Sequence, residues 1–253
     1  MKYGINKLAL ISVRAKASDR DEIVTQLLFG EIFTIVDETE KWIKIINHFD
    51  SYEGWICKKQ YKDISKEQFD LLSKSPYEIC LDKFSVLNNI IINDEILIPT
   101  GSILYNLKED LVSFLDTKYI FKGKIASKDF KDVEKYAMKF LKSPYLWGGK
   151  GFMGIDCSGF TQLVYSLCGI SIPRDASEQE KKGKVISSVY NAEKGDLVFF
   201  NNDKEKINHV GIYLGNNNII HASGKVRIDR VDDQGIFKSG SKTHNFHSIK
   251  RLF

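Results

Sequence analysis

Three residues, one cysteine and two histidines, could together form the catalytic group of a cysteine hydrolase. Cys157 lies in the run Asp156-Cys157-Ser158-Gly159-Phe160, and the histidines are His209 and His221. A thiol in the first turn of a helix faces unpaired backbone N–H groups and the positive end of the helix dipole, which favour the thiolate. One imidazole can exchange the thiol proton while a third polar group orients that imidazole. These residue types predict acyl transfer through a thioester.

The nucleophile needs a helix, and the sequence after Asp156 predicts one. Apolar residues recur at helical spacing, at Phe160, Leu163, Val164 and Leu167. Asp156 suits the N-cap, and Gly169 supplies a stop. Taken alone, Cys157 could equally be a buried structural thiol, because free cysteine is among the most buried residue types.

The two histidines lie in segments that read as neighbouring strands, over 208–214 and 218–224, with a turn at Gly215 and the following asparagines. The alternative for His209 is an ordinary strand-end residue, and for His221 a strand-core residue. His48, His244 and His247 lack comparable neighbours, so we expect them at the surface.

Six segments in the second half of the chain resemble the NlpC-type cell-wall peptidases, a branch of the papain-like cysteine hydrolases. Their order and approximate spacing also fit. The segments are Pro144-Tyr145-Leu146-Trp147-Gly148-Gly149, Asp156-Cys157-Ser158-Gly159-Phe160, Ile172-Pro173-Arg174-Asp175, Gly195-Asp196-Leu197, His209-Val210-Gly211-Ile212-Tyr213 and Ile220-His221-Ala222. The resemblance implies a papain-like α+β catalytic domain over 125–253, with helices on one side of a mostly antiparallel sheet. Ser127 is expected to cap its first helix, which would end before Pro144.

The first half of the chain reads as short β segments separated by polar turns, typical of two small barrels. Both stretches resemble bacterial SH3-like domains, which we place at 1–62 and 63–124. The first has candidate strands at 8–13, 32–38, 42–46 and 54–57, with a long loop or short helix at 17–29. The second has candidates at 79–81, 85–87, 90–92, 95–97 and 118–121.

The resemblance also implies the roles of the catalytic residues. Cys157 is the nucleophile, His209 the general base and acid, and His221 the group that orients His209. Tyr145 matches the family tyrosine whose hydroxyl helps form the oxyanion hole, and the Cys157 backbone N–H would be the other donor. The alternative for Tyr145 is a packed aromatic residue.

The substrate-binding residues implied by the resemblance flank the nucleophile and extend into the first barrel: Asp156, Ser158, Asp175, Glu22, Tyr52 and Trp147. Asp175 would meet the amino end of the substrate, with an acid and a tyrosine from the first barrel. Glu31 rivals Glu22 for that acid, and Arg174 could serve either a substrate carboxylate or a structural ion pair. Ala176 stands where some relatives have a hydroxyl residue, which puts one substrate hydrogen bond in doubt.

The amino-acid composition limits the classes of protein to which this chain can belong. With 43% apolar and 28% charged residues, the chain is an ordinary globular protein, and its net charge of +4 does not indicate nucleic-acid binding. Four scattered cysteines form neither a disulfide framework nor a zinc pattern. No segment approaches the ~20 apolar residues of a membrane span, and the N-terminus lacks a secretory signal. We therefore expect a cytoplasmic monomer without a cofactor or metal.

The sequence thus predicts an endopeptidase that hydrolyses the γ-D-glutamyl bond to the diamino acid in peptidoglycan stem peptides, chiefly those with a free amino-terminal L-Ala. One alternative is a papain-like amidase or acyltransferase with another acyl substrate. A second is a non-catalytic protein whose barrels bind cell wall.

Overall fold

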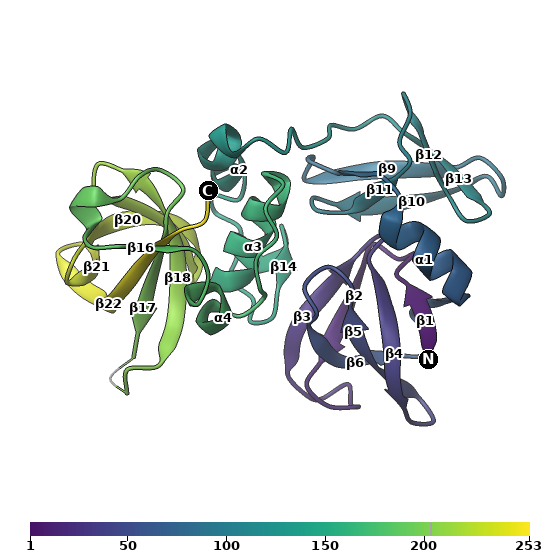
Figure 1. Ribbon diagram of the computed structural model, residues 1–253, viewed down its shortest axis with the longest axis horizontal. Coiled ribbons are helices and arrows are strands. Elements are labelled where there is room, and N and C mark those ends of the chain that lie inside the picture. The colour runs from purple at the N-terminus through teal and green to yellow at the C-terminus, as the bar shows by residue number, and fades with distance from the viewer. Residues whose placement is uncertain (203) are drawn as a thin grey trace. The chain divides into compact units, whose positions relative to one another are not determined.

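The computed structural model describes residues 1–202 and 204–253, which form two compact units (Figure 1). The first unit holds Met1–Ala126 with Lys150–Phe152, and the second holds Ser127–Gly149 with Met153–Phe253. Each unit has a seven-stranded sheet and a buried core of its own. No helix in the described ranges is long and apolar enough to cross a membrane.

A seven-stranded antiparallel sheet forms the first part of unit 1, in the order β3-β2-β6-β5-β4-β1-β7. In β2, Ile11 and Val13 alternate with less buried neighbours, so one face of the strand enters the core. The strands are β1 (Lys2–Ile5), β2 (Leu10–Arg14), β3 (Ile23–Leu28), β4 (Ile32–Glu38), β5 (Trp42–Asn47), β6 (Glu53–Cys57) and β7 (Lys62–Ile64).

The segment 17–29 contains β3, so its prediction as a long loop or short helix was wrong. β3 pairs with β2 along most of its length, and Leu27 belongs to the core cluster of this sheet. The β-branched residues Val24 and Thr25 suit a pleated strand better than a helix.

The second part of unit 1 contains a four-stranded sheet, a strand pair and one helix. The sheet has the order β10-β9-β13-β12, and the pair is β11-β8. The elements are α1 (Lys66–Lys74), β8 (Tyr77–Ile79), β9 (Phe84–Asn89), β10 (Asp94–Pro99), β11 (Ile103–Tyr105), β12 (Leu111–Phe114) and β13 (Thr117–Phe121). Helix α1, which sequence reasoning missed, begins with a capping box in which Ser65 and Gln68 bond each other's backbone N–H groups.

Residues 90–92, predicted as a strand, form the turn between β9 and β10. The Asn89 side-chain oxygen accepts the backbone N–H groups of Ile91 at 3.0 Å and Ile92 at 3.4 Å. A side chain that bonds the following backbone in this way stabilises a turn, which outweighs the β propensity of the isoleucines.

Unit 2 contains five helical segments: η1 (Phe130–Asp132), α2 (Val133–Lys139), α3 (Cys157–Leu167), α4 (Ala176–Glu180) and η2 (Val189–Asn191). The helix predicted after Ser127 begins instead as a 3-10 turn and continues as α2. Its cap is Asp129, whose Oδ1 accepts the backbone N–H of Lys131 at 3.0 Å. Ser127 lies outside the helix, where its hydroxyl bonds Asp132.

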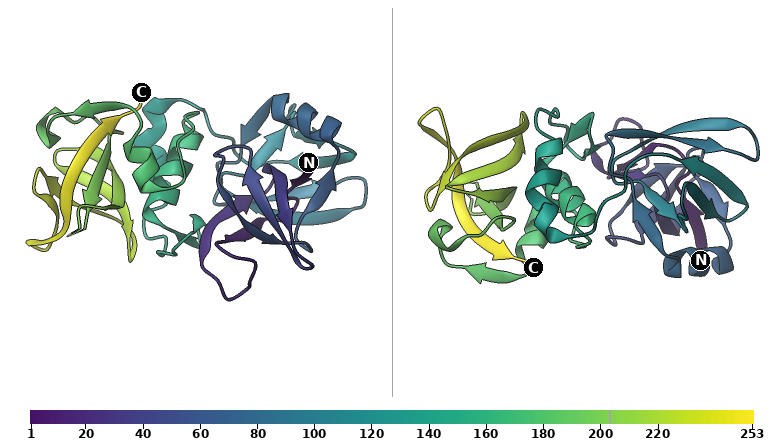
Figure 2. Two further views of the ribbon diagram at one scale, coloured as in Figure 1. Left: turned by 60° about the horizontal axis from the view of Figure 1, so that its bottom comes forward. Right: turned by 90° about the horizontal axis from the view of Figure 1, so that it is seen from above.

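The large sheet of unit 2 is antiparallel, in the order β16-β22-β17-β18-β19-β20-β21, and β21 also pairs with β22 (Figure 2). That extra pairing closes six strands into a barrel. The strands are β16 (Lys184–Ile186), β17 (Leu197–Asn201), β18 (Ile207–Gly215), β19 (Asn218–Ser223), β20 (Lys225–Asp232), β21 (Gly235–Lys238) and β22 (Ser241–Arg251); two short strands, β14 (Lys150–Gly151) and β15 (Gly154–Ile155), precede α3.

Helix α3 packs against β18 and β19 of this barrel. Strand β17 is apolar from Leu197 to Phe200, as expected of a strand with both faces covered. Val198 and Phe200 join one core cluster, while Leu197 and Phe199 on the opposite face are also fully buried. The α+β class and the antiparallel sheet are confirmed, and the sheet has the further property of closing on itself.

Candidate active site

Cys157 is the first residue of helix α3, as predicted. Its N-cap is Asp156, whose Oδ1 accepts the backbone N–H of Gly159 at 2.7 Å. Gly169, with a φ of +81°, follows the helix and permits the left-handed turn that ends it. The thiol therefore sits where backbone N–H groups are exposed at a helix start.

Gly159 is required by the backbone packed against it. A Cβ at this position would lie 2.4 Å from the carbonyl oxygen of Gly149 and 3.0 Å from Asp156 Oδ1. The glycine of the Asp-Cys-Ser-Gly run thus lets the helix start pack against the turn before β14. A similar close approach explains Gly211 on β18, where a Cβ would lie 2.9 Å from the Cβ of His221.

Burial controls the ionisation of the nucleophile. It raises the pKa of the Cys157 thiol to about 12, and the nearby Asp156 carboxylate adds to this effect. Backbone N–H groups of Val210 and Ser158 donate to the sulfur and oppose the increase. The helix-start N–H of Ser158 favours the thiolate, as expected, but desolvation is the larger effect and favours the thiol. A base must remove the proton within the site.

His209 and His221 are brought into direct contact by strands β18 and β19. His209 Nε2 lies 2.7 Å from His221 Nδ1, and the two side chains are buried. Burial, and after it the electrostatic influence of His221, His244 and Arg227, lowers the pKa of His209 well below its usual value. The N–H of Val210 bonds the Cys157 sulfur, and Val210 directly follows His209, so the sulfur lies beside the backbone of β18 next to this histidine.

Three further residues surround this pair, and sequence reasoning identified none of them. On β20, Asp229 Oδ2 lies 3.0 Å from His221 Nε2 and accepts the Arg227 Nε–H at 2.7 Å. On β22, the His244 ring stacks on His209 with centroids 4.2 Å apart. Burial, and after it the electrostatic influence of His221 and Arg227, lowers the pKa of His244 to about 4.

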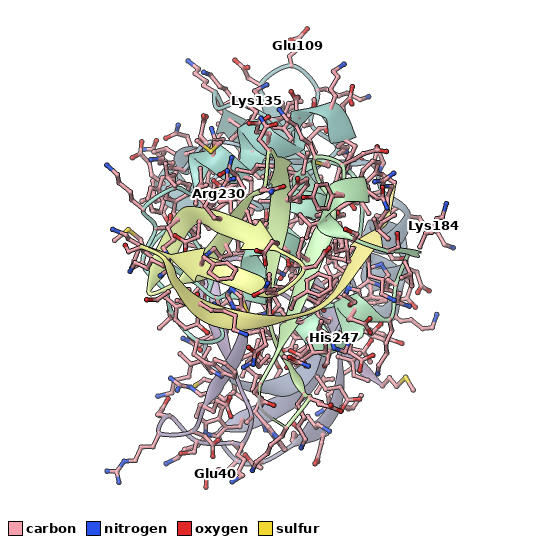
Figure 3. The ribbon with its side chains drawn as sticks, turned by 90° about the vertical axis from the view of Figure 1, so that its left-hand side faces the viewer. Glu40, Glu109, Lys135, Lys184, Arg230 and His247 are labelled. Atoms are coloured by element: carbon pink, nitrogen blue, oxygen red, sulfur yellow. The ribbon has the colours of Figure 1, made fainter. Side chains whose placement is uncertain are left out.

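The expectation that His244 is a surface residue was wrong, because its side chain is partly buried. His48 and His247 are exposed, and His247 is labelled in Figure 3. Closure of the barrel through β21 and β22 brings residue 244 to the histidine pair, and no local pattern reveals this. The spacing of Arg227 and Asp229 could be read from the sequence. Their place beside His221 depends on the strand register, in which Arg227 lies opposite His221. None of the His, Cys, Asp and Glu side chains in the described residues forms a group of three able to hold a metal ion.

Arg174 forms a buried ion pair with Asp156. Its Nη2 lies 2.6 Å from Asp156 Oδ2, its Nη1 lies 3.0 Å from Oδ1, and the same Nη1 donates to the Ser158 hydroxyl at 2.8 Å. Asp156 Oδ2 also accepts the backbone N–H of Gly148 at 2.8 Å. Arg174 thus holds the residues on both sides of Cys157, which favours the structural ion pair over a substrate carboxylate.

Replacing Arg174 by methionine should leave the Asp156 carboxylate buried without its cation. We expect the free energy of unfolding to fall by about 3 kcal/mol, as is usual when one partner of a buried pair is removed. Urea denaturation of Arg174→Met measures this. The matched control is Arg230→Met, because Arg230 is exposed on β20. Equal stability of the two variants would contradict a structural role for Arg174.

The remaining predicted residues of unit 2 occupy distinct positions. Tyr145 is half-buried, and burial, with a smaller electrostatic contribution from Cys157 and Asp156, raises the pKa of its hydroxyl. Trp147 is 59% exposed. Asp175 is exposed at the start of α4, directly after the anchored Arg174.

Glu22 and Tyr52 lie in unit 1. Glu22 is exposed just before β3, and Tyr52 is partly buried between β5 and β6. Their rival Glu31 is buried, where its Oε1 lies 2.9 Å from Lys150 Nζ and its Oε2 accepts the Leu28 N–H at 2.9 Å. Desolvation raises the pKa of Glu31. Its carboxyl group is therefore committed to contacts inside unit 1.

Comparison with protein families gives two matches. Residues 142–243 match the NlpC/P60 family, and residues 13–60 match the bacterial dipeptidyl-peptidase Sh3 domain. The first match contains Cys157 and both catalytic histidine candidates.

Relatives are similar along most of the chain. A gamma-D-glutamyl-L-lysine dipeptidyl-peptidase of Bacillus subtilis (strain 168) is 31% identical over 217 residues, covering 79% of this chain and 72% of the relative. A protein of the same name from Bacillus cereus is 29% identical over 234 residues, covering 81% and 68%. Dipeptidyl-peptidase 6 of Lysinibacillus sphaericus is 29% identical over 240 residues, covering 84% and 86%.

The fold agrees with these relationships. A crystal structure of an NlpC/P60 family protein from Bacillus cereus superposes with a TM-score of 0.85 and 22% identity, covering 99% of each chain. The similarity therefore includes the β-rich first unit as well as the unit that carries Cys157. This chain belongs to the NlpC/P60 family of cysteine peptidases, with a bacterial SH3 domain before the catalytic part.

Proposed function

We propose that the protein hydrolyses the γ-D-glutamyl bond to the diamino acid in peptidoglycan stem peptides that carry a free amino-terminal L-Ala. The observation that carries this proposal is the match of residues 13–60 to a dipeptidyl-peptidase Sh3 domain, in a chain that aligns with γ-D-glutamyl-L-lysine dipeptidyl-peptidases along most of its length. An enzyme that releases a dipeptide must recognise the amino end of its substrate.

The proposed reaction begins at the buried thiol. His209 takes the Cys157 proton as the sulfur attacks the γ-carbonyl carbon, so the transfer creates no net charge in a site that disfavours single charges. The Tyr145 hydroxyl and the Cys157 backbone N–H would stabilise the oxyanion. The C–N bond then breaks as His209 returns the proton to the leaving amine. Water, deprotonated by His209, hydrolyses the thioester and regenerates the thiol.

Recognition of the free amine is assigned to carboxylates. The contacts of Arg174 with Asp156 and Ser158 hold the chain beside the nucleophile, and Asp175 follows it with an exposed side chain. In unit 1, the burial of Glu31 against Lys150 supports Glu22 as the second acid. Tyr52 would add a hydrogen bond. A charge-assisted contact of this kind is stronger than a neutral one.

The test compares the tripeptide L-Ala-γ-D-Glu-L-Lys with its N-acetylated form. We expect acetylation to lower kcat/KM by roughly 10- to 100-fold, because hydrogen bonds to charged groups contribute about 1.5–3 kcal/mol. Asp175→Asn should lower kcat/KM for the free tripeptide and narrow the difference between the two substrates. The control is Glu178→Gln, which removes an exposed carboxylate from the same helix.

Equal rates on both peptides in the parent would reject amine recognition, and the barrels would then be plain wall-binding modules. Mass spectrometry of the products distinguishes a hydrolase from an acyltransferase and from a wall-binding protein. Transfer of the acyl group to an added amine would indicate an acyltransferase, and absence of any product would indicate a wall-binding protein. Stem peptides acquire a free amine once they are released from the glycan, so we also propose a role in peptide recycling in the cytoplasm, which cell fractionation would test.

A further inference from the structure

A continuous series of hydrogen bonds runs from His209 through a second ring to an ion pair on the neighbouring strand. His209 Nε2 lies 2.7 Å from His221 Nδ1, His221 Nε2 lies 3.0 Å from Asp229 Oδ2, and Arg227 Nε lies 2.7 Å from the same oxygen. His221 is completely buried, so each of its ring nitrogens depends on these partners.

Arg227 determines what Asp229 can do. A guanidinium only donates hydrogen bonds, and Arg227 is held at a second point by its Nη1 bond to the Ser223 carbonyl oxygen. Partial burial would raise the pKa of the Asp229 carboxyl, but hydrogen bonds from His221 and Arg227 outweigh this and lower the pKa to about 2. Asp229 is therefore an ionised carboxylate that accepts on the oxygen facing His221.

The position of every ring proton then follows. Because Asp229 Oδ2 only accepts, His221 Nε2 must carry a proton. Burial lowers the pKa of His221 despite the opposing effect of Asp229, which favours the neutral ring, and a neutral ring protonated at Nε2 has Nδ1 as an acceptor. His209 must then donate from Nε2, which leaves its Nδ1 bare as well. Nδ1 is the atom that remains to take a proton from Cys157.

We propose that Asp229, held by Arg227, is a positioning residue that fixes the tautomers of both histidines so that His209 Nδ1 can act as the base. This inference rests on the proposed role of His209. The side chain of Asp229 contacts His221 and Arg227. It acts through His221, and its negative charge stabilises the imidazolium that forms when His209 accepts the thiol proton.

The most direct test is the protonation of His221, read from long-range proton–nitrogen NMR spectra of histidine-labelled protein. The chain has five histidines, which single substitutions assign. In the parent we expect His221 to be protonated at Nε2 and bare at Nδ1. In Asp229→Ala the Nδ1-protonated form should become populated. A parent His221 protonated at Nδ1, or an unchanged spectrum in Asp229→Ala, would overturn the proposal.

Kinetics with the tripeptide give a second, independent readout. We expect Asp229→Ala to lower kcat about 10- to 100-fold with little change in KM, as is typical when a partner of a functional histidine is lost. Asp229→Asn should retain more activity, because Arg227 would turn the amide oxygen toward itself and His221. If the alanine variant does not fold, the kcat of Asp229→Asn provides the test instead. Asp232→Asn on the same strand is the control, since its oxygen still accepts the turn N–H groups.

These outcomes separate this inference from the proposed function. The NMR spectrum is recorded without substrate and therefore does not depend on the proposed function. If the spectrum shows the expected tautomers but the protein cleaves no stem peptide, only the proposed function is rejected. Equal kcat values for Asp229→Ala, Asp229→Asn and the parent would show that Asp229 and Arg227 form a purely structural ion pair.

Discussion

Cys157→Ala is expected to lower kcat for stem-peptide hydrolysis by at least about four orders of magnitude, since loss of a catalytic nucleophile typically removes most of the rate enhancement. Without the sulfur no thioester can form, and the base has no proton to accept. The fold should persist, because the substitution removes one atom from the start of a helix that keeps its Asp156 cap. Steady-state rates and far-UV circular dichroism measure the two effects.

Cys168→Ala is the matched control. Cys168 is also buried and lies at the opposite end of α3, and burial raises the pKa of its thiol to about 12 as well. The two cysteines therefore differ in position rather than in general environment. We expect the Cys168 variant to keep parental kcat. Substantial turnover by Cys157→Ala, or an equal loss in both variants, would reject Cys157 as the nucleophile.

His209→Ala should produce the second-largest loss, also about four orders of magnitude in kcat. Burial holds the Cys157 thiol in its protonated form, so hydrolysis depends on a base beside the sulfur. The pKa of His209 is itself lowered, chiefly by burial and further by the electrostatic influence of His221, His244 and Arg227. The base therefore stays unprotonated below its usual pKa, and the kcat/KM of the parent should fall only when the pH drops below about 6.5.

His247→Ala provides the comparison for His209→Ala, because His247 is an exposed histidine on β22 (Figure 3). It should leave both the rate and its pH profile unchanged. A parental pH profile in His209→Ala would show that another group removes the thiol proton. His244 is the nearest candidate, since its ring stacks on His209.

Much of the fold could be predicted from local patterns. The spacing of Phe160, Leu163 and Leu167 indicated helix α3, and Asp156 indicated its first residue. Residues that bond their own backbone were harder to interpret. The Asn89 side chain stabilises a turn at residues 90–92, where the isoleucines favour a strand. The capping box of Ser65 begins helix α1, which has few apolar residues to indicate a helix. Closure of the barrel depends on pairing between β21 and β22, which no single segment specifies.

The candidate site could likewise be predicted only in part from the sequence. Cys157, His209 and His221 lie in recognisable segments, and the structure brings the two histidines into contact. His244 and Asp229 were missed because they reach the pair through the closed barrel and through strand register rather than through sequence proximity. The effect of the helix start on the Cys157 pKa could be predicted, but the larger effect of desolvation could not, because it depends on packing that a helix pattern does not reveal.

The central claim is that Cys157 carries the dipeptide as a thioester. Rapid acid quenching of the enzyme during turnover of L-Ala-γ-D-Glu-L-Lys, followed by mass spectrometry of its peptides, tests this directly. We predict a mass increase equal to the L-Ala-γ-D-Glu acyl group on the peptide that contains Cys157, released by hydroxylamine and absent from Cys157→Ala. Product formation without an adduct at any time point, or with the adduct on another residue, would contradict the account.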